Sequence, residues 1–497
     1  MSPLLFLLII PILTMCGIVL TKDLKRVRVI SAVGMSTQLL FAFLLLYWFY
    51  QQRHAGNTDP MLFVSTTTWY ESFNIQLKFG VDGISVSMII LTAIVTFAGV
   101  FVSWQVHFLT KEFFLSLILL VTGVFGFFIS LDLFTMFLFY ELAVIPMYLL
   151  IGIWGSGPKE YSAMKLTLML MGGSALLLVG LLGIYFNSAP EGGRFTFDLT
   201  EIAKVGIPVS AQMFFFPFTF IGFGVLGALF PFHTWSPDGH ASAPTAVSML
   251  HAGVLMKLGG YGCFRVAMYL LPEAAHSLAW IFIILTTISV VYGAFGALWQ
   301  KDLKYINAYS SVSHCGLVLF ALLMMNETAT TGAFLQMISH GLMTALFFAL
   351  IGMIYGRTHT RMINEMGGLM KVIPFLSVLY VIAGLASLGL PGLSGFVAEM
   401  TIFVGSFQHT DTFHRVAAIV ACSSIVITAV YILRVVGTLL LGPIKNDHYL
   451  QLKDARWFEK VGGMTLLIAI VAIGIAPLWL SNLLRESLAV LLQPFTN

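Results

Sequence analysis

Long apolar runs dominate this sequence, and their number constrains the fold more than any other feature. A helix needs about 20 mainly apolar residues to cross the hydrocarbon core of a bilayer. Fourteen runs close to that length occur along the 497 residues. They cover approximately 3–21, 29–50, 83–104, 113–130, 132–155, 161–186, 212–233, 241–270, 277–299, 305–325, 330–355, 372–408, 416–441 and 461–484. We therefore predict an all-α membrane protein with about 14 transmembrane helices.

The composition agrees with this class and excludes others. Hydrophobic residues make up 59% of the chain and charged residues only 9%, whereas soluble domains carry about 25% charged residues. A large soluble enzyme and a disordered chain are therefore excluded. The net charge of +3 gives no reason to expect a nucleic-acid partner. The four cysteines lie in apolar runs without a C-x-x-C pair, which argues against disulfides, zinc and iron–sulfur ligation.

Lysine and arginine are distributed unequally between the two sides that these spans define. If the loop from Lys22 to Arg28 is cytoplasmic, that side carries fifteen cations and the opposite side six, with four inside spans. Cytoplasmic loops of membrane proteins carry the excess of lysine and arginine. We therefore predict an N-terminus on the outer side. The first run, whose cationic cluster follows its apolar core, is expected to be an uncleaved signal-anchor span.

Two of the predicted spans contain residues that interrupt helices. The seventh span holds Pro217, Gly227 and Pro231, and the twelfth holds the sequence LGLPG at 388–392. Proline removes a backbone donor and glycine loosens the hydrogen-bond ladder, so both spans are expected to break. Breaks five spans apart indicate two inverted five-helix repeats, although simple proline kinks give the same pattern. The predicted domains are spans 1–3 (1–112), the first repeat of spans 4–8 (113–270), the second repeat of spans 9–13 (271–441) and span 14 (442–497).

Few charges lie deep in the predicted spans, and a deep charge is expected to have a function because burying it costs several kcal/mol. Among the acids, only Glu141 in span 5 and Glu399 in span 12 are deep, and Lys257 in span 8 is the deep lysine. The deep histidines are His251, His314 and His340. Carboxylate, amine and imidazole groups can all exchange protons near neutral pH when their surroundings tune them. These side chains therefore predict a path for proton transfer.

Simpler interpretations exist for some of these residues. A single intramembrane histidine is often a hydrogen-bonded packing residue. Lysine and arginine near span ends extend their charged groups to the membrane interface, which explains Lys165, Arg265 and Arg434 without a role in proton transfer. Lys257 is too deep for that explanation. Since no nucleotide or redox motif accompanies these residues, the driving energy is expected to come from an ion gradient or a partner protein.

Several segments of the sequence resemble a known family. They are Phe139–Trp154 (FYELAVIPMYLLIGIW), Pro231–Arg265 (PFHTWSPDGHASAPTAVSMLHAGVLMKLGGYGCFR), Lys304–Gly316 (KYINAYSSVSHCG), Gln336–Leu342 (QMISHGL) and Gly389–Phe407 (GLPGLSGFVAEMTIFVGSF). In these segments, and over nearly its whole length, the chain is similar to the antiporter-like proton-pumping subunits of respiratory complex I. Within that family it most resembles the M-type chains, the bacterial counterparts of mitochondrial NADH dehydrogenase subunit 4.

The resemblance implies a fold, a set of site residues and a set of partners. It implies fourteen transmembrane helices with helices 7 and 12 broken. It places the input-side glutamate at Glu141, the central lysine at Lys257 and the exit-side acid at Glu399, with His314 and His340 as the linking histidines. It implies no cofactor in this chain, because NADH, FMN, iron–sulfur clusters and quinone bind to partner subunits of the complex. The expected lateral partners are neighbouring antiporter-like subunits in the bacterial inner membrane.

One departure from the family affects the input side. The family normally carries a lysine in span 7, paired with the span-5 glutamate, and Leu226 occupies that position here. His251 is a second departure, because M-type chains commonly have an apolar residue there. Two hypotheses follow. Either His251 or Lys165 partly replaces the missing lysine, or the input half of this subunit is weakened.

Two other functions remain open at the level of sequence. A subunit of a multi-subunit cation/proton antiporter or of a membrane-bound hydrogenase shares the fold and the charged residues. A non-pumping structural spacer agrees with the presence of Leu226, although Lys257, Glu399 and the linking histidines are retained. Whether sodium replaces the proton is also open.

Overall fold

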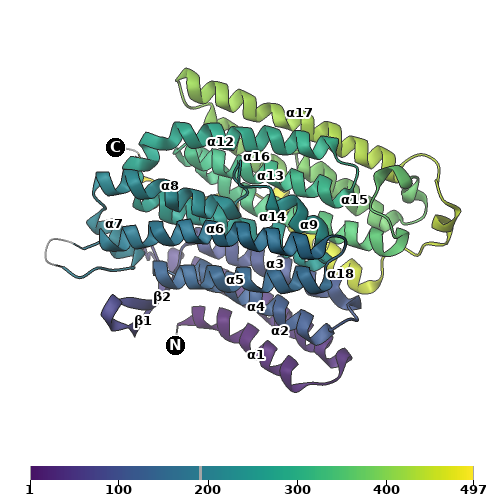
Figure 1. Ribbon diagram of the computed structural model, residues 1–497, viewed down its shortest axis with the longest axis horizontal. Coiled ribbons are helices and arrows are strands. Elements are labelled where there is room, and N and C mark those ends of the chain that lie inside the picture. The colour runs from purple at the N-terminus through teal and green to yellow at the C-terminus, as the bar shows by residue number, and fades with distance from the viewer. Residues whose placement is uncertain (1, 190–192, 496–497) are drawn as a thin grey trace.

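The computed structural model describes residues 2–189 and 193–495, and it is largely helical (Figure 1). Among the described residues, 12 helices are long and apolar enough to cross a membrane, which confirms the predicted membrane class. They are α1 (Phe6–Leu20, preceded by the short turn Pro3–Leu5), α2 (Leu24–His54), α3 (Gly83–Val102), α4 (Thr110–Ile129), α5 (Leu133–Trp154), α6 (Lys159–Phe186), α8 (Val209–Leu226), α12 (Pro272–Trp299), α13 (Leu303–Leu323), α14 (Glu327–Thr358), α17 (Thr412–Leu440) and α18 (Trp457–Ile475).

Shorter helices occupy the expected spans that contain breaks. The expected seventh span (212–233) contains α8, which ends at Leu226, and α9 (Trp235–Ser242) follows and reaches the start of the expected eighth span. The twelfth is α15 (Pro374–Ser387) followed by α16 (Ser394–Ser406). The eighth consists of α10 (Thr245–Leu250), a π-helical turn (His251–Leu255), α11 (Met256–Gly262) and a second π-helical turn (Cys263–Met268). Helices therefore end at the expected places in spans 7 and 12. Pro217, however, lies inside α8 and does not break it. The count of fourteen crossings and the inverted repeats stay predictions.

Acidic residues at span ends begin many of these helices. The Asp82 carboxylate accepts from the backbone N–H of Ser85 at 2.9 Å, and the Asp132 carboxylate accepts from that of Thr135 at 3.0 Å. Asp23, Asp302 and Asp411 cap α2, α13 and α17 in the same way, and the amide oxygen of Asn326 caps α14. Such caps satisfy backbone donors that a helix leaves open at its start. The position of these five aspartates at span ends therefore has a structural reason.

One end of the helix array carries a β-hairpin, which the sequence analysis did not predict. The hairpin, β1 (Leu62–Tyr70) and β2 (Ile75–Val81), lies there beside α7 (Leu199–Val205), at the left in Figure 1. The Ser2 hydroxyl donates to the carbonyl of Phe63 at 3.0 Å, so the start of the chain lies at this same end, which we call the hairpin end. The last expected span was too long at its C-terminal side. Helix α18 ends at Ile475, and α19 (Leu478–Leu491) is a separate helix after Pro477.

The centre of the array is formed by α13 and α14. In each of them 94% of the most apolar stretch is buried, against 28% for the first helix and 39% for α17. Helix α14 packs against α13, α16, α10 and the first π-helical turn. The central helices therefore hold polar side chains away from lipid, and these side chains form the site.

Candidate functional site: a buried lysine–histidine–glutamate series

Lys257 lies at the centre of the array, on the short helix α11 between the two π-helical turns. Its side chain is buried, with only 2% of the residue exposed. Its Nζ atom lies 2.5 Å from the carbonyl oxygen of Ala252 and 2.7 Å from Nδ1 of His340 on α14. Ala252 belongs to the first π-helical turn, five residues before the lysine. The turn thus supplies a backbone acceptor for the ammonium group, and π-helical turns often occur at functional sites.

Two histidines continue the contacts from Lys257 towards span 12. The rings of His340 and His314 lie 5.2 Å apart between centroids. His314 Nδ1 lies 3.0 Å from the Gln336 amide nitrogen and 3.6 Å from Oε1 of Glu399 on α16. The latter distance is an ion-pair separation and exceeds a hydrogen bond. These contacts form one buried series, which we call the relay. It consists of Lys257 on α11, His340 on α14, His314 on α13 and Glu399 on α16.

The break in span 12 makes room for Glu399. Gly389 adopts φ of +65° and Gly392 adopts φ of +92°, a left-handed region that favours glycine. A Cβ atom added at Gly389 would lie 2.8 Å from Oε2 of Glu399. Glycine at this position therefore both permits the turn between α15 and α16 and leaves space for the carboxyl group.

His240 and His251 form a second pair of buried histidines. The rings of His240, on α9, and His251 lie 4.4 Å apart between centroids, and His251 also stacks on Trp235 at 5.0 Å. Among the described residues, none forms a hydrogen bond with any ring nitrogen of this pair. Buried polar atoms without partners are uncommon and require an explanation. The structure therefore places His251 near the relay, but with no direct contact to Glu141.

Glu141 is less buried than the sequence suggested. It lies on α5 and is half-buried, and its Oε1 atom is enclosed without a hydrogen-bond partner among the described residues. The Ser174 side chain on α6 lies beside the carboxyl group. Leu226 is the last residue of α8 and is fully buried. Among the described residues, no cation pairs with Glu141.

Lys165 has a partner of its own. Its Nζ atom lies 2.7 Å from Oδ2 of Asp238 on α9, and both side chains are partly exposed. On α6, Lys165 precedes Ser174 by nine residues, which is about 14 Å along a helix at 1.5 Å per residue. The lysine is therefore held away from the Ser174 position, where Glu141 lies.

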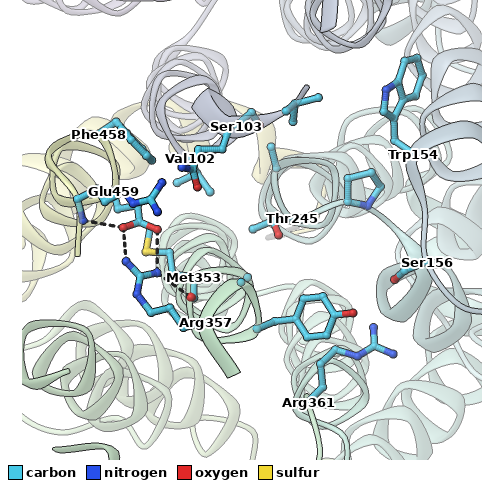
Figure 2. A pocket seen from close by; sticks show the side chains of 18 of the residues that line it. Val102, Ser103, Trp154, Ser156, Thr245, Met353, Arg357, Arg361, Phe458 and Glu459 are labelled. Carbon is cyan, nitrogen blue, oxygen red and sulfur yellow. Dashed lines mark hydrogen bonds and ion pairs between the residues drawn. The ribbon is translucent and has the colours of Figure 1, made fainter. Parts of the chain in front are cut away.

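A cavity of about 580 Å³ opens at the end opposite the hairpin, and Figure 2 shows side chains that line it. Its walls come from α10, α14, α18 and the end of α3, and Arg357 binds Glu459 there through two contacts of 2.9 and 2.6 Å. Lys304 also lines it. We assigned Lys304 to a loop, but the residue is buried, and its Nζ atom donates to the carbonyl of Ala243 at 2.6 Å. Ala243 follows His240 by less than one helical turn.

A buried ion pair lies beyond the relay at the hairpin end, and the sequence analysis missed it. Arg265 was expected to extend to the membrane interface, but it is only 1% exposed and pairs with Asp82. Its guanidinium carbon lies 5.2 Å from the ring centre of Tyr261, whose hydroxyl lies 2.8 Å from that of Ser85. The expectation failed because its buried partner lies 183 residues away in sequence. Arg434 does lie near a helix end, where it donates to the carbonyls of Leu298 and Gln300.

These features define an antiporter-like membrane protein, in which interrupted helices bring a lysine, two histidines and a glutamate into one buried series. Residues 130–428 match the family model described as "NADH:quinone oxidoreductase/Mrp antiporter, TM". The chain belongs to this family. It is 36% identical over 461 residues to "NAD(P)H-quinone oxidoreductase chain 4 1" of Microcystis aeruginosa, an alignment that covers 92% of this chain and 86% of that protein.

Solved structures share the fold. A chain of respiratory complex I from Thermus thermophilus superimposes with a TM-score of 0.88 at 24% identity, covering 99% of this chain and 100% of that one. A chain of the Mrp complex from Dietzia sp. DQ12-45-1b gives a TM-score of 0.85 at 18% identity, covering 99% and 97%. The fold is therefore common to a respiratory complex I and an Mrp complex. The sequence relative described above is named as a quinone oxidoreductase chain.

Proposed function

We propose that this chain is the proton-translocating membrane subunit of an NADH:quinone oxidoreductase. The observation that carries the proposal is the relay, a buried contact series from Lys257 to Glu399 in a relative of NAD(P)H-quinone oxidoreductase chain 4. Amine, imidazole and carboxyl groups in contact can pass a proton when a change in their surroundings shifts their relative proton affinities. The chain acts as a non-redox part of the enzyme, a translocase. NADH, FMN, iron–sulfur clusters and quinone belong to its partner subunits.

Protons reach Lys257 from the cavity at the end opposite the hairpin. Lys304 faces that cavity and contacts the backbone beside His240. His240 and His251 then lie between this point and the relay, with ring nitrogens open for proton exchange. The cation-rich loops at this end favour the cytoplasmic side, since lysine and arginine are enriched there. The N-terminus then lies on the outer side of a bacterial cytoplasmic membrane.

Copurification tests membership in the complex. A tag on this chain is expected to retrieve flavin and iron–sulfur polypeptides from detergent-solubilised membranes, together with neighbouring antiporter-like subunits. Retrieval of antiporter subunits without any redox polypeptide contradicts the proposal and supports the multi-subunit cation/proton antiporter. A membrane-bound hydrogenase is distinguished by redox polypeptides that oxidise hydrogen instead of NADH.

The input side of this subunit is weakened. Glu141 has no cationic partner among the described residues, Lys165 is bound to Asp238, and Leu226 fills the place of the family's lysine. Replacing Leu226 with lysine is expected to give the Glu141 carboxylate a counter-charge and to raise the proton-to-electron ratio of the reconstituted complex. Leu226→Met, a change of similar volume, serves as the matched control and leaves the ratio unchanged.

Two outcomes would contradict this account of the input side. An unchanged ratio in Leu226→Lys shows that the missing lysine does not limit pumping. A wild-type ratio in Glu141→Gln removes Glu141 from the path altogether. Both variants are compared at equal amounts of assembled complex, so that loss of assembly is not read as loss of pumping.

A further inference from the structure

Two histidines and an aspartate gather at the hairpin end, outside the relay and the cavity. They are His409, Asp411 and His414, in the connection from α16 to α17 and the first turn of α17. Each offers one ligand atom, and these atoms lie within 4.8 Å of one another. A tetrahedral zinc site with metal–ligand bonds of about 2.0–2.2 Å needs ligand atoms about 3.4 Å apart. The side chains must therefore reorient and move closer for all three to bind one ion.

His409 is already held in a form that suits a ligand. Its Nε2 atom lies 2.8 Å from the carbonyl oxygen of Met324 and donates its proton there. A neutral imidazole with the proton on Nε2 has its lone pair on Nδ1. Metal-binding histidines usually donate their other ring N–H to a carbonyl or carboxylate in this way. The backbone of His409 is fixed as well, because Arg415 Nε donates to its carbonyl at 3.0 Å.

Asp411 and His414 are positioned by the start of α17. The Asp411 carboxylate accepts from the backbone N–H of His414 at 3.0 Å and lies 2.7 Å from its Nδ1. The rings of His409 and His414 stack at 4.3 Å between centroids, so both imidazoles lie close together, and they must turn out of this stack to direct nitrogen lone pairs at one metal ion.

From this cluster we propose a zinc-binding site formed by His409, Asp411 and His414. Two imidazoles and one carboxylate form a ligand set that suits Zn²⁺ and disfavours Mg²⁺ and Ca²⁺, which prefer oxygen ligands. The fourth position is left for water. The nearby Arg415 charge weakens the site, although its guanidinium is engaged with a backbone carbonyl.

A metal at this site would restrain α16, the half-helix that carries Glu399. The Asn326 amide, at the start of α14, donates to the carbonyl of Gly405 near the end of α16 at 2.9 Å. Zinc would add a second tie, from the segment just after α16 to the first turn of α17. Under the proposed function, on which this consequence rests, bound zinc slows proton release by fixing the position of Glu399.

Zinc binding to the purified intact complex tests the site without relying on pumping. Calorimetric titration with Zn²⁺ alone is expected to show one binding event that is lost or weakened in His409→Gln and His414→Gln. Removing a residue that only supports a metal ligand lowers metal affinity roughly 10- to 100-fold. The zinc affinity of the two cluster variants should fall by at least as much. His276→Gln is the matched control, because His276 is exposed at the start of α12 and lies outside the cluster. Equal zinc stoichiometry and affinity in wild type and both cluster variants would overturn the site.

Proton pumping by the same samples tests the restraint separately. Zinc added on the hairpin side is expected to slow pumping by the wild type and by His276→Gln, but not by the cluster variants. If the wild-type complex binds zinc but pumps at the same rate with and without it, the proposed restraint on α16 is wrong. The metal site itself is not contradicted by that result. A complex that binds zinc but never pumps would instead contradict the proposed function.

Discussion

Replacing Lys257 with alanine is expected to stop proton pumping through this chain while the complex still assembles. The change removes the ammonium group that lies between the Ala252 carbonyl and His340 Nδ1. The Ala252 carbonyl then loses its ammonium partner and His340 Nδ1 keeps only the Cys315 Sγ contact at 3.9 Å, at a cost of about 1–3 kcal/mol for each acceptor. The variant and the wild type are therefore compared at equal amounts of assembled complex, so that a loss of stability is not read as a loss of pumping. Proton uptake by proteoliposomes on addition of NADH and quinone measures the effect.

The comparison needs controls for assembly and for electron transfer. Lys301→Ala is the matched lysine control, because Lys301 is exposed in the connection before α13. Reduction of a water-soluble electron acceptor by NADH should be unchanged in both variants, since this chain holds no redox group in the proposed function. Wild-type pumping in Lys257→Ala would mean that the subunit is a structural spacer.

Replacing Asp82 with asparagine is expected to destabilise the assembled subunit strongly. Asparagine still caps α3, so the helix start is preserved and the loss comes from the ion pair. Arg265 would remain charged and buried without its partner, and two of its guanidinium nitrogens, Nε and Nη1, already lack hydrogen bonds among the described residues. Breaking a buried pair in this way costs about 3–5 kcal/mol. The thermal midpoint of the purified complex and the yield of assembled subunit should both fall.

A double replacement separates charge from packing. Asp82→Asn combined with Arg265→Met removes both charges and should recover most of the stability, because replacing a whole buried pair by apolar groups is often neutral. Asp23→Asn is the control, since Asp23 caps α2 at an exposed position and loses only a surface charge. If the single and double variants are equally unstable, the ion pair is not what holds α3 against the eighth span.

Much of the fold could be predicted because the bilayer restricts the possibilities. Apolar runs identify spans, and the glycine–proline segments at Pro231 and Pro391 identify where helices end. Pro217 is an exception to this rule, because it lies inside α8 and does not end it. The β-hairpin was missed because a two-stranded element in a polar loop leaves a weak pattern beside the long apolar runs.

The site was predictable where a charge lies far from both span ends. Lys257 and Glu399 satisfy that condition, and the structure brings them into one series with His314 and His340. Depth in the predicted spans did not identify Arg265 and Lys304 as buried residues. Both lie near span ends, where residues usually reach the membrane interface. Their burial depends on partners that only the packed helices bring near. The order of contacts within the relay likewise depends on packing, because its members come from four helices.

The proton-to-electron ratio of the complex carrying Glu399→Gln tests the central claim most directly. Glutamine keeps the shape of the side chain beside His314 but cannot release a proton at the end of the relay. The account predicts a ratio below that of the wild type, while Glu160→Gln, which changes an exposed glutamate at the start of α6, keeps the wild-type ratio. A wild-type ratio in Glu399→Gln, measured at equal NADH oxidation and equal assembly, would contradict proton transfer through the relay.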